Sequence, residues 1–281
     1  MQMETNLEKM VLRIGFLGAG SIAEAMLRGI TKQNLLLPQN IYVTNRSDDE
    51  RLRELGSRFG IRSTRDLQEV IDNVDILILA MKPKDVMEAC HGMRGMVRPD
   101  QLVISVIAGV STELIRKWLQ IDYPIIRTMP NTSSAIGLSA TGIAKGRFAN
   151  DDHLQLAMGL FESIGRVFVV PEAELDVVTG LSGSGPAYIY YMVEAMEEAG
   201  AKAGLSREMA RQLTVQTLLG AAQMLSNSHE EPEVLRKKIT SPSGTTQAGL
   251  EVLESYDFQQ GVASAVLRAA ERARELGAQF R

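Results

Sequence analysis

The chain has 281 residues, of which 45% are apolar and 23% charged, a globular mixture that excludes a long disordered or fibrous protein and fits one large or two ordinary domains. Its 30 Lys and Arg residues against 34 Asp and Glu residues give a net charge of −4, which offers no broad basic surface for nucleic acid or an anionic membrane. The single cysteine, Cys90, excludes an internal disulfide, and the three histidines are scattered, so no metal site is expected.

The first ~170 residues alternate between short apolar runs and helical stretches of mixed polarity. Because the apolar runs lack polar alternation, they indicate parallel strands that are buried on both faces. The predicted strands span residues 11–17, 41–44, 75–80, 102–108 and 124–129, and two further runs, 138–144 and 166–170, would extend the same sheet. The predicted helices span residues 21–33, 50–59, 84–93 and 112–119. This order predicts an α/β Rossmann-type, doubly wound parallel sheet.

After Pro171 the strand pattern stops and apolar residues recur at helical spacing. The two clearest faces hold Ala210, Leu213, Thr214, Thr217, Leu218 and Ala221, and Val262, Ala265, Val266, Ala269, Ala270 and Ala273. Helices with such small residues make a thin core, and we expect another subunit to complete it. We therefore predict a dinucleotide-binding domain over residues 1–171 and an all-α C-terminal dimerisation and substrate-binding domain over residues 172–281.

A glycine-rich turn follows the first predicted strand and opens the first predicted helix. Residues 18–23 read GAGSIA, where Gly18 permits a tight turn, Gly20 lets the backbone approach a pyrophosphate, and Ala23 allows close packing of helix and strand. The helix N-terminus adds N–H groups for the phosphates. Alone, this motif also fits a tight turn that binds nothing, but its strand–turn–helix context predicts a dinucleotide site.

In dinucleotide-binding sheets, the residues at the end of the second strand distinguish NAD from NADP. Here they are Asn45, Arg46 and Ser47, whereas an NAD enzyme usually has Asp or Glu at this point. A guanidinium suits the 2′-phosphate, so NADPH is the expected cofactor and NADH the alternative. Arg46 also fits a solvated loop residue that is balanced by the acids at 48–50. The loops 80–83, 108–109 and 129–132, which include Asn131, end the next strands and are expected to line the nicotinamide crevice, although turn chemistry alone would also explain them.

Two clusters in the second half are hard to explain as structure alone. Residues 181–187, LSGSGPA, interrupt a helical stretch with glycines, which are costly inside helices. Residues 240–249, TSPSGTTQAG, place hydroxyl and free N–H groups at a helix start, an arrangement that binds anions. A helix cap with a Pro or Gly bend remains the alternative for each cluster.

These motifs together resemble the pyrroline-5-carboxylate reductase family, over almost the whole chain. The stretches that carry the resemblance are GFLGAGSIAEAM (15–26), AMKP (80–83), IAGV (107–110), RTMPNT (127–132), VTGLSGSGPAYI (178–189) and ITSPSGTTQAGL (239–250). The resemblance implies NAD(P)H-dependent reduction of 1-pyrroline-5-carboxylate, a cyclic imino acid, to L-proline. It also implies homodimers with interlocked helical domains, often assembled into decamers.

The resemblance also implies which residues form the site. The loop that holds the substrate carboxylate maps onto Ser241, Gly244, Thr245 and Thr246. The cofactor contacts map onto Leu17, Gly18, Ala19, Gly20, Ser21, Ile22, Asn45, Arg46, Ser47, Ala80, Met81, Lys82, Pro83, Val106, Ile107 and Ala108. Two positions depart from the family pattern: Ser243 stands where a glycine is usual, and residues 65–67 replace a loop segment that often carries a cofactor-binding asparagine.

No His, Lys or carboxylate stands out as a general acid, which fits an imine that arrives already protonated. Thr246 is the candidate catalytic residue, as a hydrogen-bond partner of the ring nitrogen, and the alternative is a helix-start hydroxyl that bonds to the backbone. Related cyclic imine or β-hydroxyacid-type reductases, or a non-catalytic NADPH-binding protein that docks a partner, remain alternative functions. No run is long and apolar enough to cross a membrane, and residues 1–10 lack the apolar core of a secretory signal, so a cytoplasmic protein is expected.

Overall fold

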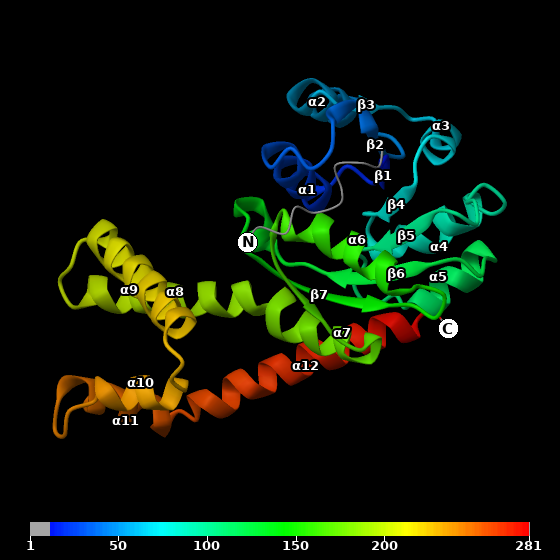
Figure 1. The fold of residues 1–281 in the computed structure, drawn as a ribbon. Coiled ribbons are helices and arrows are strands. Elements are labelled where there is room, and N and C mark those ends of the chain that lie inside the picture. Colours follow the sequence, from blue (N-terminus) through cyan, green and yellow to red (C-terminus); the bar gives the residue numbers. More distant parts are fainter. Residues whose placement is uncertain (1–11, 281) are drawn as a thin grey trace. The chain divides into compact units, whose positions relative to one another are not determined.

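The computed structural model describes residues 12–280 (Figure 1). Residues 1–10, where the sequence predicts no secretory signal, lie outside this range. Contacts between residues divide the chain into two compact units, one up to Ser184 together with the end of the chain from Arg268, and one over Gly185–Leu267. The boundary predicted at 171/172 separates cofactor binding from substrate binding and dimerisation. Contacts within one chain do not test that separation, so the boundary stays a prediction.

The first unit contains one eight-stranded sheet with the strand order β3-β2-β1-β4-β5-β6-β7-β8. The strands are β1 (Ile14–Leu17), β2 (Ile41–Thr44), β3 (Arg62–Ser63), β4 (Ile76–Leu79), β5 (Leu102–Ser105), β6 (Ile125–Met129), β7 (Ser139–Lys145) and β8 (Gly165–Val169). All seven predicted strands are confirmed. Only β3 has no predicted counterpart, because its two residues are exposed and form no apolar run.

The sheet is mostly parallel, as predicted, but β7 runs antiparallel to β6 and β8 runs parallel to β7. The length of the connections explains this reversal. A parallel neighbour needs a crossover of roughly a dozen residues or more, and only residues 130–138, with the short 3-10 helix η3 (Thr132–Ile136), join β6 to β7. The connection from β7 to β8 contains a whole helix, α6 (Asp151–Glu162), and so permits the parallel pair.

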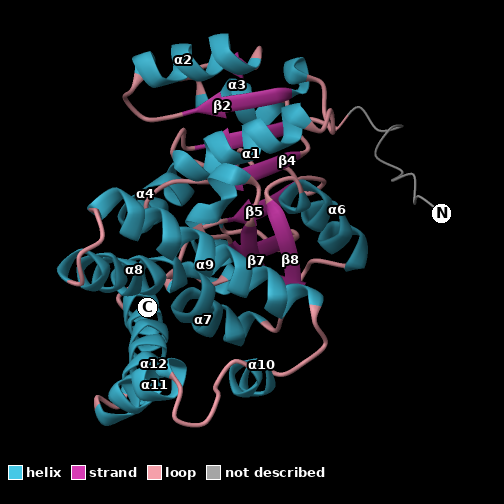
Figure 2. Cartoon of the chain, turned by 90° about the vertical axis from the view of Figure 1, so that its left-hand side faces the viewer, coloured by secondary structure: helices cyan, strands magenta, loops and turns pink. Residues whose placement is uncertain are grey.

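Helices cover both faces of this sheet (Figure 2). They are α1 (Ser21–Lys32), α2 (Asp49–Phe59), α3 (Leu67–Asp72), α4 (Pro83–Gly92), α5 (Thr112–Leu119) and α6 (Asp151–Glu162). Along β4, Ile76 and Ile78 join the core under α1 and α6, whereas Leu77 and Leu79 join the core under α4 and α5. This double burial explains why the strands read as unbroken apolar runs.

After β8 the described chain is helical, as predicted. The short segments η4 (Glu172–Glu174), α7 (Leu175–Val178) and the π-helical turn η5 (Thr179–Gly183) belong to the first unit. The helices α8 (Gly185–Lys202), α9 (Arg207–Asn227), α10 (Pro232–Lys238), α11 (Thr245–Ser255) and α12 (Phe258–Ala278) follow. No helix within residues 12–280 is long and apolar enough to cross a membrane.

The second unit leaves many large apolar side chains exposed in a single chain. On α9, the predicted face buries only Ala210 and Thr214, while the side chain of Leu213 is 52% exposed. Tyr191 and Tyr256 are 78% and 80% exposed. A soluble monomer rarely exposes so much apolar surface within so few residues, so we expect another protein surface to pack against these helices.

Candidate active site

The glycine turn after β1 brings the ends of three strands together. The Gly18 N–H donates to the Thr44 carbonyl at the end of β2, over 2.8 Å, and the Ala80 N–H after β4 donates to the Leu17 carbonyl, over 2.9 Å. Gly18 has a φ of +119°, and a Cβ at this position would lie 2.3 Å from the Ala80 carbonyl oxygen. Only glycine fits here, because both the backbone conformation and the space exclude a side chain.

Gly20 has the opposite surroundings. It is the N-cap of α1, no side chain caps this helix end, and a Cβ at Gly20 would meet no atom within 4 Å. The first N–H groups of a helix have no acceptor within the helix, and together with the helix dipole they attract an anion. The turn therefore fits a pyrophosphate, since protein fills the space at Gly18 but leaves it open at Gly20.

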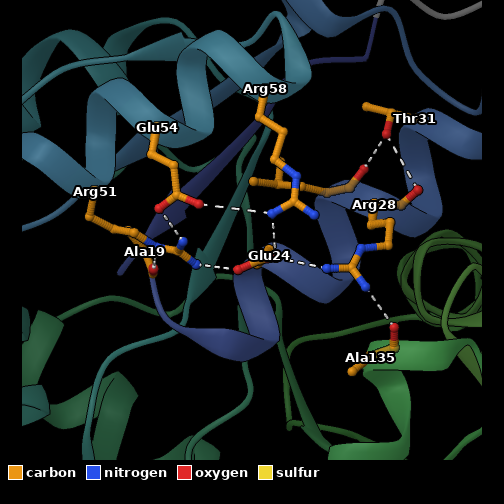
Figure 3. Close-up of polar contacts among 9 residues, drawn as sticks. Ala19, Glu24, Arg28, Thr31, Arg51, Glu54, Arg58 and Ala135 are labelled. Carbon is orange, nitrogen blue, oxygen red and sulfur yellow. Dashed lines mark hydrogen bonds and ion pairs between the residues drawn. The ribbon is translucent and has the colours of Figure 1, made fainter.

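A charged network that the sequence reasoning missed braces this turn (Figure 3). The Arg51 Nε of α2 donates to the Ala19 carbonyl over 3.0 Å, and the same guanidinium pairs with Glu24 of α1. Arg28 and Arg58 also pair with Glu24, at 2.7 and 2.9 Å. The hydrogen bond from Arg51 is the main cause that lowers the pKa of the Glu24 carboxyl. The four-residue spacing of Glu24 and Arg28 predicts their ion pair. No local sequence pattern predicts that Arg51 and Arg58, which lie on α2, also pair with Glu24.

The loop after β2 is organised by Asn45. Its side chain accepts from the N–H groups of Ser47 and Asp48, at 3.1 and 2.8 Å, and donates to the Asp48 carbonyl over 2.8 Å. The Asp48 side chain in turn caps α2 by accepting from the Arg51 N–H. Asn45 and Asp48 therefore hold the shape of the loop that presents Arg46.

Arg46 itself is 74% exposed, and its guanidinium lies 3.6 and 3.7 Å from the carboxylates of Asp85 and Glu88 on α4. The acidic residues at 48–50 were the expected ion-pair partners of Arg46, but they form no ion pair with it. Exposed pairs at this length contribute little, so a phosphate can compete for the guanidinium. Arg65, which the sequence reasoning did not assign to the site, donates to the Arg46 carbonyl over 2.7 Å and brings a second cation to this loop.

The other predicted cofactor loops follow β4 and β5 at the same edge of the sheet. Pro83 is the first residue of α4, a position where proline is favoured, and the Val106 N–H donates to the Leu79 carbonyl over 3.2 Å. The end of α12 braces the next turn, since a Cβ at Gly277 would lie 2.2 Å from the Gly109 carbonyl oxygen. The sequence placed α12 in the helical domain and did not predict this contact.

Asn131 follows β6, and its side chain is engaged by the protein. Its Nδ2 donates to the Ser182 carbonyl over 3.0 Å, and its Oδ1 accepts from the Ser133 N–H over 3.2 Å. These contacts join the loop after β6 to the π-helical turn that contains Ser182.

The predicted substrate loop lies in the second unit, at the start of α11. Gly244 is the N-cap of this helix, and its N–H donates to the Ser241 carbonyl over 3.0 Å. Ser243 has a φ of +57°, a left-handed backbone conformation that favours glycine, and its N–H donates to the Gln247 side chain over 2.8 Å. Thr245 and Thr246 form the first helical turn.

The hydroxyls of this loop are available. Within residues 12–280, the side chains of Ser241, Thr245 and Thr246 form no hydrogen bond, whereas the neighbouring Thr240 hydroxyl donates to the Arg236 carbonyl. The alternative for Thr246, a hydroxyl bonded to the backbone, is therefore not found in the described part of the chain. Over the same residues, no group of three or more His, Cys, Asp or Glu side chains is placed to hold a metal ion.

Two family models match the chain. The model for pyrroline-5-carboxylate reductase dimerisation matches residues 172–276. The model described as NADP oxidoreductase, coenzyme F420-dependent, matches residues 13–109. The two matches fall on the helical half and on the part of the sheet that carries the glycine turn.

Curated proteins and solved structures are similar over nearly the whole chain. Pyrroline-5-carboxylate reductase 1 of Bacillus subtilis is 46% identical over 264 residues, which are 94% of this chain and 89% of that protein. The structure of a pyrroline-5-carboxylate reductase from Coxiella burnetii has a TM-score of 0.88 at 36% identity and covers 95% of this chain and 99% of its own. A Plasmodium falciparum pyrroline carboxylate reductase with NADP bound has a TM-score of 0.86 at 27% identity, covering 95% and 98% of the two chains.

Proposed function

The chain belongs to the pyrroline-5-carboxylate reductase family, and from this membership we infer that it reduces 1-pyrroline-5-carboxylate to L-proline with NAD(P)H. The observation that carries this function is the presence of both halves of the site in one chain of this family. One half is a glycine turn with open space at Gly20, and the other is a helix start with free hydroxyls at residues 241–246. Steady-state NADPH oxidation with 1-pyrroline-5-carboxylate as the substrate tests it.

We assign cofactor binding to the loops at the carboxyl edge of the sheet. The turn from Leu17 to Ile22 holds the pyrophosphate, the turn from Asn45 to Ser47 holds the adenosine ribose, and the loops 80–83 and 106–108 flank the nicotinamide. When bound, the nicotinamide supplies the hydride that reduces the imine carbon. The protein contributes position and electrostatics, and these loops fix the reactive face toward the substrate.

The 241–246 loop is assigned to the substrate. Free N–H groups at the start of α11 and the hydroxyls of Ser241 and Thr245 suit a carboxylate, and Gly244 keeps the backbone accessible. A fixed carboxylate leaves the ring with one face toward the cofactor. We assign Thr246 as the hydrogen-bond partner of the ring nitrogen, and no general acid is needed because the imine binds already protonated.

The Thr246→Ala variant tests that role. We expect kcat to fall by about 10- to 100-fold while the KM for the imine changes little, because the lost hydrogen bond strengthens in the transition state. Steady-state kinetics with saturating NADPH give both constants. Thr240→Ala is the matched control, since its hydroxyl bonds to the Arg236 carbonyl and its loss should spare kcat. Wild-type turnover in Thr246→Ala would leave Thr246 without a catalytic role.

A preference for NADPH is assigned to Arg46. We expect Arg46→Ala to raise the KM for NADPH by about tenfold or more, since a charge-assisted hydrogen bond contributes about 1.5–3 kcal/mol. The KM for NADH should barely change, because NADH lacks the 2′-phosphate. The control Arg53→Ala removes a cation from α2 whose guanidinium bonds to the Asp49 carbonyl. If the KM values for NADPH and NADH rose equally, Arg46 would act by holding the shape of the loop and not by binding the 2′-phosphate.

We also propose that the helical half forms a homodimer, and that the chain works in the cytoplasm. The exposed apolar side chains of the second unit and the dimerisation model that matches residues 172–276 support the dimer. Assembly of dimers into decamers stays a prediction from the family resemblance.

Leu213→Asp tests the dimer. This leucine is 52% exposed in the single chain, so aspartate should be tolerated by the fold but should place an unpaired charge in a subunit interface. We expect the variant to elute as a monomer or to aggregate at micromolar concentration, measured by size exclusion with light scattering. Gln216→Asp, an exposed polar position on the same helix, is the control and should keep the wild-type mass. A wild-type protein that is monomeric and fully active would contradict the proposal.

A further inference from the structure

One face of β6 holds the segment that leads from β8 to the π-helical turn. Arg127 and Met129 lie two residues apart on β6 and so share one side of the strand, and Asn131 follows in the loop after it. Each contacts a different point of residues 172–183. This segment contains part of the SGSG cluster that the sequence analysis singled out.

The first attachment is an ion pair. The Arg127 guanidinium is 5% exposed, lies 2.8 Å from the Asp176 carboxylate of α7 and 3.9 Å from the Glu172 carboxylate. Glu172 also accepts from the N–H and the hydroxyl of Thr112, both at 2.7 Å. A buried charge with such partners fixes the beginning of the segment, because separating the pair would leave Arg127 buried and uncompensated.

The second and third attachments hold the π-helical turn itself. A Cβ at Gly183 would lie 2.8 Å from the Met129 Cε, so the turn packs closely on β6. The Asn131 Nδ2 donates to the Ser182 carbonyl over 3.0 Å. The Asn131 Oδ1 accepts from the Ser133 N–H, so both ends of the side-chain amide are held, and the Asn131 backbone N–H donates to the Ser139 hydroxyl over 3.1 Å.

The turn that these contacts hold has an unusual backbone. The Ser184 N–H reaches back five residues to the Thr179 carbonyl, over 2.8 Å, in place of the four-residue step of an α-helix. Single π-turns within helices are rare and occur frequently at functional sites. In a regular α-helix the Ser182 carbonyl would accept from the N–H of residue 186, but Pro186 has no N–H, and Asn131 satisfies this carbonyl instead. The Asn131 side chain therefore supplies a donor that the helix backbone lacks here and ties the π-helical turn to the loop after β6.

We propose that Asn131 is a positioning residue that fixes residues 179–184 at the carboxyl edge of the sheet, where the reaction takes place, rather than a residue whose amide binds the cofactor. The proposal rests on the reductase function inferred above. The Arg127–Asp176 pair anchors the same segment farther from the edge. A loosened π-turn displaces the SGSG backbone, and a displacement of about 1 Å near reacting groups costs up to about 100-fold in rate.

The test is the Asn131→Asp variant. The carboxylate still accepts from the Ser133 N–H, but it has no proton for the Ser182 carbonyl. We expect kcat with 1-pyrroline-5-carboxylate to fall by about 10- to 100-fold while the dissociation constant of NADPH, from fluorescence titration, stays within about twofold. Amide hydrogen exchange at Ser184 should accelerate even without substrate, a readout that does not depend on the reaction. Asn150→Asp, at the N-cap of α6, is the control and should change none of these.

Three results would overturn the proposal: weaker NADPH binding with unchanged kcat, exchange at Ser184 that matches the wild type, or wild-type kinetics throughout. If Asn131→Asp does not fold, Asn131→Ser provides the same test, because a hydroxyl is too short to reach Ser182. A wild-type protein that does not reduce the imine would contradict the proposed function instead, and the exchange measurement would still decide whether Asn131 holds the turn.

Discussion

The Gly244→Val variant should lose at least about 100-fold in kcat/KM for the imine while its affinity for NADPH stays within a few-fold. Gly244 caps α11 with an extended backbone, and even a Cβ there would lie 3.0 Å from the Ser241 carbonyl oxygen. The two further methyl groups of valine would point into the space where the loop meets the carboxylate. A loss of that contact in both ground and transition states amounts to about 3 kcal/mol.

Ser243→Gly is the control for this loop. Ser243 occupies the left-handed region, with a φ of +57°, so glycine should relieve strain of about 1 kcal/mol and keep turnover near the wild-type value. Steady-state kinetics for the imine and fluorescence titration for NADPH separate the two halves of the site. If Gly244→Val instead abolished NADPH binding and spared the KM for the imine, the assignment of the two loops would be reversed.

The Gly20→Val variant should lose about 100-fold or more in affinity for both NADPH and NADH with little change in stability. Its Cβ meets no atom within 4 Å in the protein, so the side chain is tolerated until a pyrophosphate needs the same space. The change of N-cap residue costs about 1 kcal/mol or less in the free energy of unfolding. Titration with each cofactor and thermal unfolding measure the two effects.

Variants at Gly92 and Gly18 are the controls for Gly20→Val. Gly92→Val, also with no atom within 4 Å of its Cβ, lies at the end of α4 and should leave both cofactor affinity and stability unchanged. Gly18→Ala should unfold at a clearly lower temperature, because its Cβ would lie 2.3 Å from the Ala80 carbonyl oxygen. Unchanged cofactor affinity in Gly20→Val would remove the glycine turn from the pyrophosphate site.

The sheet could be predicted from sequence because its strands are buried on both faces. Alternating residues of β4 fill two different cores, so no polar residue interrupts the run. The exposed pair of residues in β3 gives no such signal. The helix α6 was also not predicted, and its start explains why: Asn150 caps it in a box closed by His153, where Glu or Gln is the usual partner.

The local backbone of the candidate site was predictable where a motif fixes it, as in the glycine turn and in the helix start within residues 240–249. Contacts between distant segments were not predictable. Arg51 reaches the Ala19 carbonyl from another helix, and Gly277 at the end of α12 packs on Gly109 after β5. Helical spacing shows that one face of α12 is buried, but it does not show what covers that face.

The central claim is that this chain catalyses NAD(P)H-dependent reduction of 1-pyrroline-5-carboxylate. The most direct test is steady-state oxidation of NADPH by the purified protein, with proline measured as the product. We expect NADPH to be consumed only when 1-pyrroline-5-carboxylate is added, with one proline formed for each NADPH oxidised. Turnover with a different cyclic imine or a 2-keto acid but not with this substrate, or NADPH binding without any turnover, would contradict the claim.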